Sequence, residues 1–129
     1  MLARTAVVHL LLDACPSFEA PWVQHLASER PVEDRLLLDL SLFARHLVAL
    51  AADDSDAELG ASFAAVERLL REGDADVQEA TIVGVLEGVL FAAEQAALSP
   101  ERLTRFLGPL STRAFRDLDA YWSRLQRAC

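Results

Sequence analysis

Apolar residues recur along the chain at intervals of three and four positions, which is the period of an α-helix. The clearest stripe consists of Leu36, Leu40, Phe43, Leu47 and Leu50. Strand-type patterns are scarce, and the main run of strand-forming residues is "TIVGVL" at 81–86. The pattern predicts an all-α protein with helices over 3–15, 17–29, 31–51, 56–72 and 75–97, a short helix ending at 107, and a last helix over 110–127.

Turn and capping residues support these boundaries. Ser55 and Glu58 have the spacing of a capping box, which predicts that a helix begins at about residue 56. Gly73 fits a left-handed C-terminal cap of that helix, and Asp74 fits the N-cap of the next one. Further boundaries are expected at Pro16, Pro31 and Ser99-Pro100.

The segment 75–97 is the most apolar of the predicted helices. Its middle is apolar on nearly all faces, which predicts a central buried helix. Gly84 and Gly88 lie four residues apart and therefore share one face. Each glycine costs about 1 kcal/mol relative to alanine inside a helix, so we expect a neighbouring helix to approach closely there.

The length and composition of the chain fit one globular domain. The chain has 129 residues, of which 53% are hydrophobic, so a single core over residues 1–129 is expected. We predict a compact bundle of five to seven helices, and hairpins such as 56–72 with 75–97 are compatible with a HEAT-like stack. Cys15 and Cys129 are too far apart in sequence to form a disulfide framework, which favours a reduced, cytoplasmic setting.

The charge of the chain excludes some partners. The net charge is −8, which is unfavourable for binding nucleic acid or an anionic membrane surface. The charge is also uneven, because residues 99–129 carry a net +3 and the rest of the chain −11. No window has about 18 uninterrupted apolar residues, so no membrane-spanning helix is expected. The chain is thus predicted to have an acidic body and a basic last helix.

Motifs for catalysis are absent from the sequence. It has no glycine-rich phosphate loop, no nucleophile elbow and no cysteine or histidine pair with metal-ligand spacing, so we expect no enzyme activity, cofactor or metal. His9 with Asp13, and His25 with Glu29, are four residues apart and leave a metal-binding bundle as an alternative. Cys15 lies on an apolar helix face and is interpreted as a core thiol. Glu87 is a candidate buried acid, because it interrupts the apolar segment.

Two acidic clusters are the candidate partner-binding residues. Because they flank the helix 56–72, they are expected at opposite ends of one helical hairpin. A concentrated acidic surface can attract and block a basic protein through charge complementarity. The alternative interpretation is a solvated surface that only promotes solubility. The residues are Asp53, Asp54, Asp56 and Glu58 in one cluster, and Glu72, Asp74, Asp76 and Glu79 in the other.

Residues 63–122 also carry motifs of a known kind. They include "Leu-Leu-x-x-Gly-Asp" ending at Asp74, "Gly-x-Leu-Glu" ending at Glu87, and "Leu-Gly-Pro" at 107–109 before an aromatic-rich last helix. In these motifs the chain resembles a family of small uncharacterised bacterial all-helical proteins. The resemblance implies an immunity protein or an accessory partner that is encoded near a polymorphic toxin.

The leading hypothesis is a non-enzymatic binding protein that neutralises a basic toxin domain with its acidic surface. Exposed aromatic residues would add affinity, and the candidates are Trp22, Tyr121 and Trp122. One alternative is a structural module or homodimer that associates through the 84–88 face or the last helix. The other alternative is a bundle that binds a small molecule or a metal ion.

Overall fold

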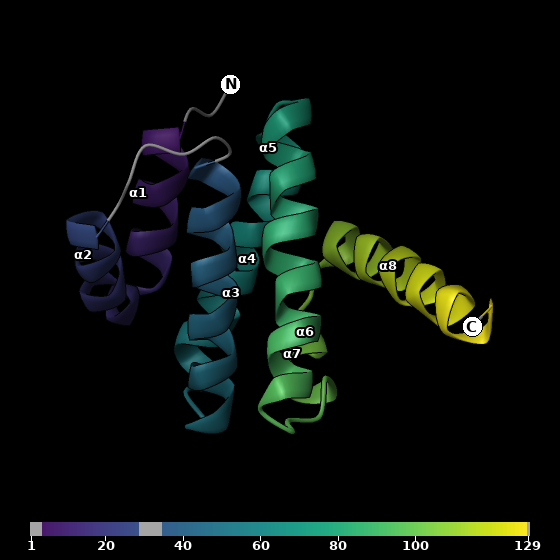
Figure 1. The fold of residues 1–129 in the computed structure, drawn as a ribbon. Helices are drawn as coiled ribbons and strands as arrows, with labels where there is room; N and C mark the ends of the chain where they lie inside the picture. Colours follow the sequence, from purple (N-terminus) through teal and green to yellow (C-terminus); the bar gives the residue numbers. More distant parts are fainter. Residues whose placement is uncertain (1–3, 29–34, 129) are drawn as a thin grey trace.

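The described residues form helices and no strand, which confirms the predicted all-α fold (Figure 1). The computed structural model describes residues 4–28 and 35–128. The elements are α1 (Arg4–Ala14), η1 (Pro16–Phe18), α2 (Glu19–Ser28), α3 (Arg35–Ala52), α4 (Asp56–Glu72), α5 (Ala75–Ala80), η2 (Thr81–Glu87), α6 (Gly88–Gln95), α7 (Glu101–Thr104) and α8 (Pro109–Ala128). The predicted role of Pro31 falls outside the described residues.

The bundle is built from helices that alternate in direction. α1 and α3 run one way, α4 returns behind them, and α5, η2 and α6 continue into one another in the direction of α3 (Figure 1). α4 and the α5–η2–α6 segment thus form the predicted hairpin, while the HEAT-like arrangement stays a prediction. Among the described residues, no helix is both long and apolar enough to cross a membrane.

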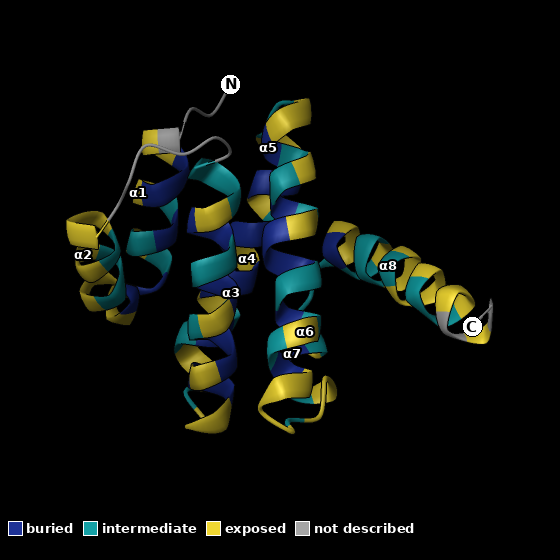
Figure 2. Cartoon of the chain, viewed as in Figure 1, coloured by how far each residue is buried: buried dark blue, intermediate teal, exposed yellow. Residues whose placement is uncertain are grey.

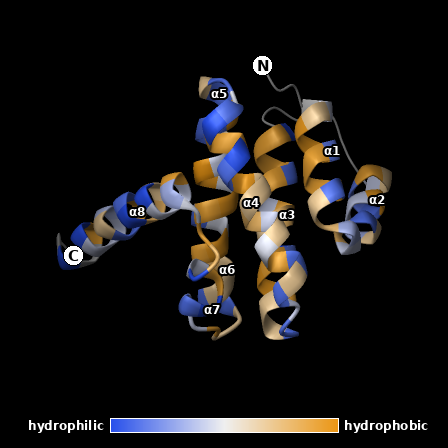
Figure 3. Ribbon diagram, turned by 180° about the vertical axis from the view of Figure 1, so that it is seen from behind, coloured by the Kyte–Doolittle hydropathy of each residue, from blue (hydrophilic) through white to orange (hydrophobic). Residues whose placement is uncertain are grey.

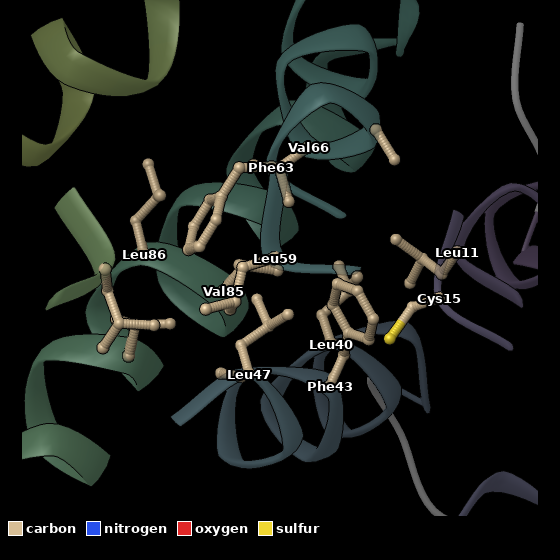
Figure 4. Packing of buried hydrophobic residues seen from close by; sticks show 14 of the residues in the cluster. Leu11, Cys15, Leu40, Phe43, Leu47, Leu59, Phe63, Val66, Val85 and Leu86 are labelled. Atoms are coloured by element: carbon tan, nitrogen blue, oxygen red, sulfur yellow. The ribbon is translucent and has the colours of Figure 1, made fainter. Parts of the chain in front are cut away.

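The core lies where α1, α3, α4 and η2 meet (Figure 4). The predicted stripe on α3 points into it, since Leu40, Phe43 and Leu47 are fully buried. Phe63 and Leu59 face them from α4. Figure 2 shows that burial is concentrated in these inner faces, while α2 and α8 at the two sides of the bundle are much more exposed.

The two glycines of the predicted central helix do lie against a neighbour. A Cβ atom on Gly84 would lie 2.7 Å from the Cβ of Leu40, and one on Gly88 would lie 2.9 Å from the Cβ of Ala44. α3 therefore approaches η2 and α6 more closely than any larger residue would allow. The side of the helix that carries the two glycines is therefore occupied by α3 of the same chain, while the alternative of a homodimer stays a prediction.

Other expectations for this segment need correction. Residues 81–87 form a π-helix, and buried Thr81 donates a 2.7 Å hydrogen bond to the carbonyl of Val77. Burial on nearly all faces is also wrong, since the side chains of Val83 and Phe91 are 39% and 41% exposed. The reason is geometric, because α3 and α4 cover one side of this helix and α8 covers only part of the other.

Ser55, Gly73 and Asp74 do occupy cap positions, but only Asp74 makes the predicted interaction. Asp74 caps α5 as expected, and its Oδ1 accepts a 2.9 Å hydrogen bond from the amide of Val77. Ser55 is the N-cap residue of α4, but its side chain makes no capping hydrogen bond. Gly73 is extended, with φ −72°, so the predicted left-handed cap is wrong. Glycine is needed there for space, because a Cβ would lie 2.5 Å from Val77 Cγ1.

Candidate functional site

The first acidic cluster is largely neutralised within the chain. It lies at the turn between α3 and α4, against α7. Arg105 pairs with Asp56 at 3.1 Å, and Arg102 pairs with Asp54 and also donates to the carbonyl of Ala51. Basic residues near the start of the 99–129 segment thus hold α7 onto this turn.

Glu58, the fourth member of that cluster, caps a distant turn. Its Oε2 accepts a 3.0 Å hydrogen bond from the amide of Ser17 in η1. That amide is the main cause of the lowered pKa of Glu58. Ser17 Oγ lies 2.8 Å from His46 Nε2, and burial lowers the pKa of this histidine, which favours the neutral ring.

This serine–histidine pair differs from a nucleophile–base arrangement in one respect. A catalytic base is normally oriented by a third group, but Glu58 binds the backbone of Ser17 instead of the ring of His46. Cys15 lies 3.6 Å from Ser17 Oγ, and it is fully buried, which raises the pKa of its thiol. Cys15 is therefore a core thiol, as predicted, and the cluster fixes η1 against α3 and α4. Cys129 lies outside the described residues.

The second acidic cluster, at the opposite end of α4, is only partly paired. Glu72 bonds to Arg68 at 2.9 Å and Arg71 at 3.3 Å, and Asp74 is occupied as a cap. Asp76 and Glu79 are exposed and line a groove of about 430 Å³ between α3 and the α5–η2 segment. The apolar part of this groove, which we call the acidic groove, is formed by Leu36, Leu37, Ala80 and Val83.

One of the candidate histidines has a long-range acidic partner. His25 Nε2 lies 3.1 Å from Oδ1 of Asp39, a carboxylate that is 1% exposed in α3. The partner proposed from the sequence, Glu29, lies outside the described residues. Within the described residues, no group of three or more His, Cys, Asp or Glu side chains is placed to hold a metal ion.

Helix α8 is attached to the body at its N-terminus by a carboxylate. Glu67 of α4 accepts hydrogen bonds from the amides of Leu110 and Ser111, at 2.8 and 2.9 Å, and from Ser111 Oγ at 2.9 Å. Burial opposes ionisation of Glu67, but these hydrogen bonds prevail and lower its pKa. A Cβ on Gly108 would lie 2.5 Å from Glu67 Oε1, so glycine makes room for this cap.

A second attachment lies further along α8. The indole nitrogen of Trp122 donates to Glu87 Oε2 at 3.3 Å, and its ring packs edge-on against Phe91 at 5.4 Å. The candidate buried acid Glu87 is thus half-buried and holds α8 against η2. From its start beside the bundle, α8 extends away from the other helices toward the C-terminus (Figures 1 and 3).

Between these two attachments α8 and the body leave an open groove, which we call the α8 groove. It has a volume of about 350 Å³. Leu70, Gln78 and Ile82 form its body side. Leu110, Arg113, Ala114, Asp117, Leu118 and Tyr121 form its α8 side. Tyr121 is 49% exposed and Leu110 is 39% exposed, so apolar surface remains open to solvent along the groove.

The sequence stripe on α8 identified part of this surface, but it predicted core positions. Of the stripe, Phe115, Leu118 and Trp122 are half-buried, whereas Leu110 and Leu125 are exposed. Of the aromatic candidates for partner contact, Tyr121 is exposed, and Trp22 is half-buried on the far side of the bundle. The groove itself had no sequence signal, because residues from three separated segments build it.

Comparison with known proteins places the chain in one family. A family model matches residues 8–123, so the match includes the N-terminal helices that lie outside the motifs at 63–122. No curated protein and no solved structure matches the chain. The chain therefore belongs to the family described as Domain of unknown function (DUF7674).

Proposed function

We propose that this chain is a non-enzymatic protein-binding domain, and that the α8 groove receives an apolar helical segment of a partner protein. The observation that carries the proposal is the incomplete burial of the apolar face of α8. Leu110 and Tyr121 stay exposed beside an open groove, although the helix is strongly amphipathic. Apolar surface left open in this way is characteristic of interaction sites.

The lining of the groove suits a helix better than a small polar ligand. Its floor is aliphatic, with Leu70, Ile82 and Leu118, and its rim carries one cation and one anion, Arg113 and Asp117. A partner helix would place apolar residues three and four positions apart on the floor and polar groups at the rim. Tyr121 is the exposed aromatic that would contribute most to affinity.

The finer proposal is that the partner is a basic toxin domain and that this chain is its immunity protein. Asp54 and Asp56 already pair with arginines of this chain. The acidic residues that remain to attract a basic toxin are therefore Asp53, Asp76 and Glu79. These three are exposed, and no described residue pairs with them. Such charges accelerate association more than they increase affinity.

The test is photo-crosslinking from a benzoyl-phenylalanine introduced at position 121 in cells of the source organism. Position 23 on α2 is the matched control, because Val23 is 57% exposed on the opposite side of the bundle. We expect one protein to cross-link from position 121 and not from position 23. With that partner purified, Tyr121→Asp should weaken binding by at least about tenfold, and Val23→Asp should not.

Two outcomes would overturn the groove proposal: no protein cross-linked from position 121, or equal affinity of the purified partner for both variants.

The immunity proposal has its own measurement. The double variant Asp53→Arg and Asp76→Arg should slow association with the purified partner at low salt, with little change at high salt. Identical association rates at low salt would contradict the acidic-surface proposal and leave the groove proposal standing.

A further inference from the structure

The outer side of α8 carries a row of arginines, of which only Arg113 also lines the α8 groove. Arg113, Arg116, Arg124 and Arg127 are separated by three, eight and three residues, which places them on one side of the helix. All four are exposed, and no ion pair joins any of them to another described residue. We call this row the arginine stripe, and at 1.5 Å per residue it spans about 21 Å.

Apolar residues lie beside the stripe on the same helix. Leu110, Tyr121 and Leu125 are between 39% and 49% exposed. Helical geometry places Leu110 and Tyr121 about 60–80° from Arg113 around the axis, so these two side chains are accessible from the side of the stripe, whereas Leu125 lies further round the helix. The complementary surface must therefore be apolar in its middle and acidic at its edge.

The acidic groove of this same chain has that combination. Asp76 and Glu79 border an apolar lining formed by Leu36, Leu37, Ala80 and Val83. The chain's own α8 cannot reach this groove, because α8 extends away from α3 and α5 in both views of the molecule (Figures 1 and 3). The α8 of another copy has no such restriction.

The overall charge favours a second copy over two other acidic partners. Residues 1–98 carry a net −11, so nucleic acid or an anionic membrane that approached the stripe would be repelled by the body. A second copy presents the same acidic body to the stripe as an attractive surface. Packing of two α8 helices against each other is disfavoured, because it would bring two arginine stripes together.

We propose that two copies of this chain associate reciprocally, with the arginine stripe of each α8 seated on the acidic groove of the other. Such an exchange is an isologous arrangement with two identical contacts, as expected for a twofold dimer. It goes beyond the proposed function, because it assigns a role to Arg116, Arg124 and Arg127, none of which lines the α8 groove. Variants at Arg124 and Arg127 change neither the α8 groove nor the acidic residues of the immunity proposal, so they make failure of the dimer distinguishable from failure of the proposed function.

The test is the mass of the purified full chain by sedimentation equilibrium, at low and at high salt. We expect a species of twice 14.2 kDa at low salt, which dissociates as salt screens the contacts. The variant Arg124→Glu with Arg127→Glu should lower the association constant at least about tenfold, and so should Asp76→Arg with Glu79→Arg. Circular dichroism confirms that each variant is folded.

Mixing the two charge-reversal variants is the decisive experiment. In a mixed dimer one contact is of the native kind, and the other joins glutamates on α8 to arginines in the groove. Equal amounts of the two variants should therefore recover dimer that neither forms alone. Arg45→Glu is the matched control. Arg45 is an exposed arginine on α3 that belongs neither to the stripe nor to the lining of the acidic groove, so its reversal should leave association unchanged.

Three results would overturn the proposal. The first is a monomer up to about 1 mM protein at low salt, which corresponds to negligible affinity. The second is a dimer that is insensitive to both charge reversals or is not recovered by mixing. The third is a monomer whose stripe instead binds a 20-base-pair DNA duplex or phosphatidylglycerol vesicles, which would assign the stripe to a different class of partner.

Discussion

Helices α3 and α8 are the two long amphipathic helices at opposite extremes of burial. On α3 the apolar stripe is sealed, and Leu40, Phe43 and Leu47 have no exposed surface. On α8 the stripe begins and ends with residues that are 39% exposed, Leu110 and Leu125. Figure 3 shows the same contrast in hydropathy, with apolar residues gathered on the inner helices and α8 hydrophilic along much of its length.

An amphipathic stripe therefore predicts a helix with one face to be buried, but it does not predict whether the same chain or a second molecule covers that face. α3 packs against helices on several sides, whereas α8 is held mainly by Glu67 at its start and by Trp122 further along. A helix that is attached at one end and retains exposed apolar residues is suited to contact a second molecule. Substitutions in the two helices should therefore separate stability from binding.

The largest effect is expected from Phe43→Ala in α3. The ring is fully buried and packs edge-on against Phe18 at 5.0 Å. Its removal leaves a cavity among α1, α3 and α4, which should lower the free energy of unfolding by about 3–5 kcal/mol. Urea denaturation followed by circular dichroism measures this change. A loss below about 1 kcal/mol would show that the α3 stripe is no better packed than the α8 stripe.

The next largest effect is expected from a substitution at Gly84, which tests how closely α3 packs against η2. Gly84→Ala would place a Cβ 2.7 Å from Leu40 Cβ, so α3 and η2 must move apart, at about 1–3 kcal/mol. Gly60→Ala in α4 is the matched control, since its nearest neighbour is Phe106 Cδ1 at 3.9 Å. The control should gain up to about 1 kcal/mol from the higher helix propensity of alanine. Thermal unfolding should shift in opposite directions, and a shift of the same sign would refute the close approach.

The sequence predicted such local features well and long-range ones poorly. Asp74 as a cap and Gly84 as a site of close approach follow from spacing within one helix. By contrast, Glu67 and Leu110 are 43 residues apart, and no periodicity links an acid in α4 to the first amides of α8. The arginine partners of Asp54 and Asp56 could not be predicted for the same reason, because they lie about 50 positions later in the chain.

A third prediction tests the attachment of α8 at its base. Glu67→Gln keeps the size of the side chain but weakens the cap, which should lower stability by about 1–2 kcal/mol at pH 7. The folded pKa of Glu67 lies below its ordinary value of 4.5, so its ionised form is the one that stabilises the fold. That contribution is complete above the unfolded pKa and is lost as the pH falls through the folded pKa.

The stability difference between wild type and Glu67→Gln should therefore shrink as the pH is lowered below about 4.5. Urea denaturation of both proteins at several pH values measures it. Glu72→Gln is the matched control, because Glu72 is an exposed acid on the same helix that bonds only to neighbouring arginines, so its effect on stability should be much smaller than that of Glu67→Gln. A difference between wild type and Glu67→Gln that is constant with pH would contradict the carboxylate cap.

The smallest effect on stability is expected from a substitution near the C-terminal end of α8, which contrasts most directly with the buried stripe of α3. Leu125 lies three residues beyond Trp122 on the same helical stripe, and its side chain is 39% exposed. Leu125→Ala should change the free energy of unfolding of the isolated chain by less than about 0.5 kcal/mol, because little apolar surface is buried there. Leu47→Ala in α3 is the contrasting variant, because it removes a fully buried side chain and should lower the free energy of unfolding by about 2–5 kcal/mol. If Leu125→Ala instead destabilised the monomer as much as a core truncation does, the end of α8 would belong to the core of its own chain, and the contrast with α3 would not hold.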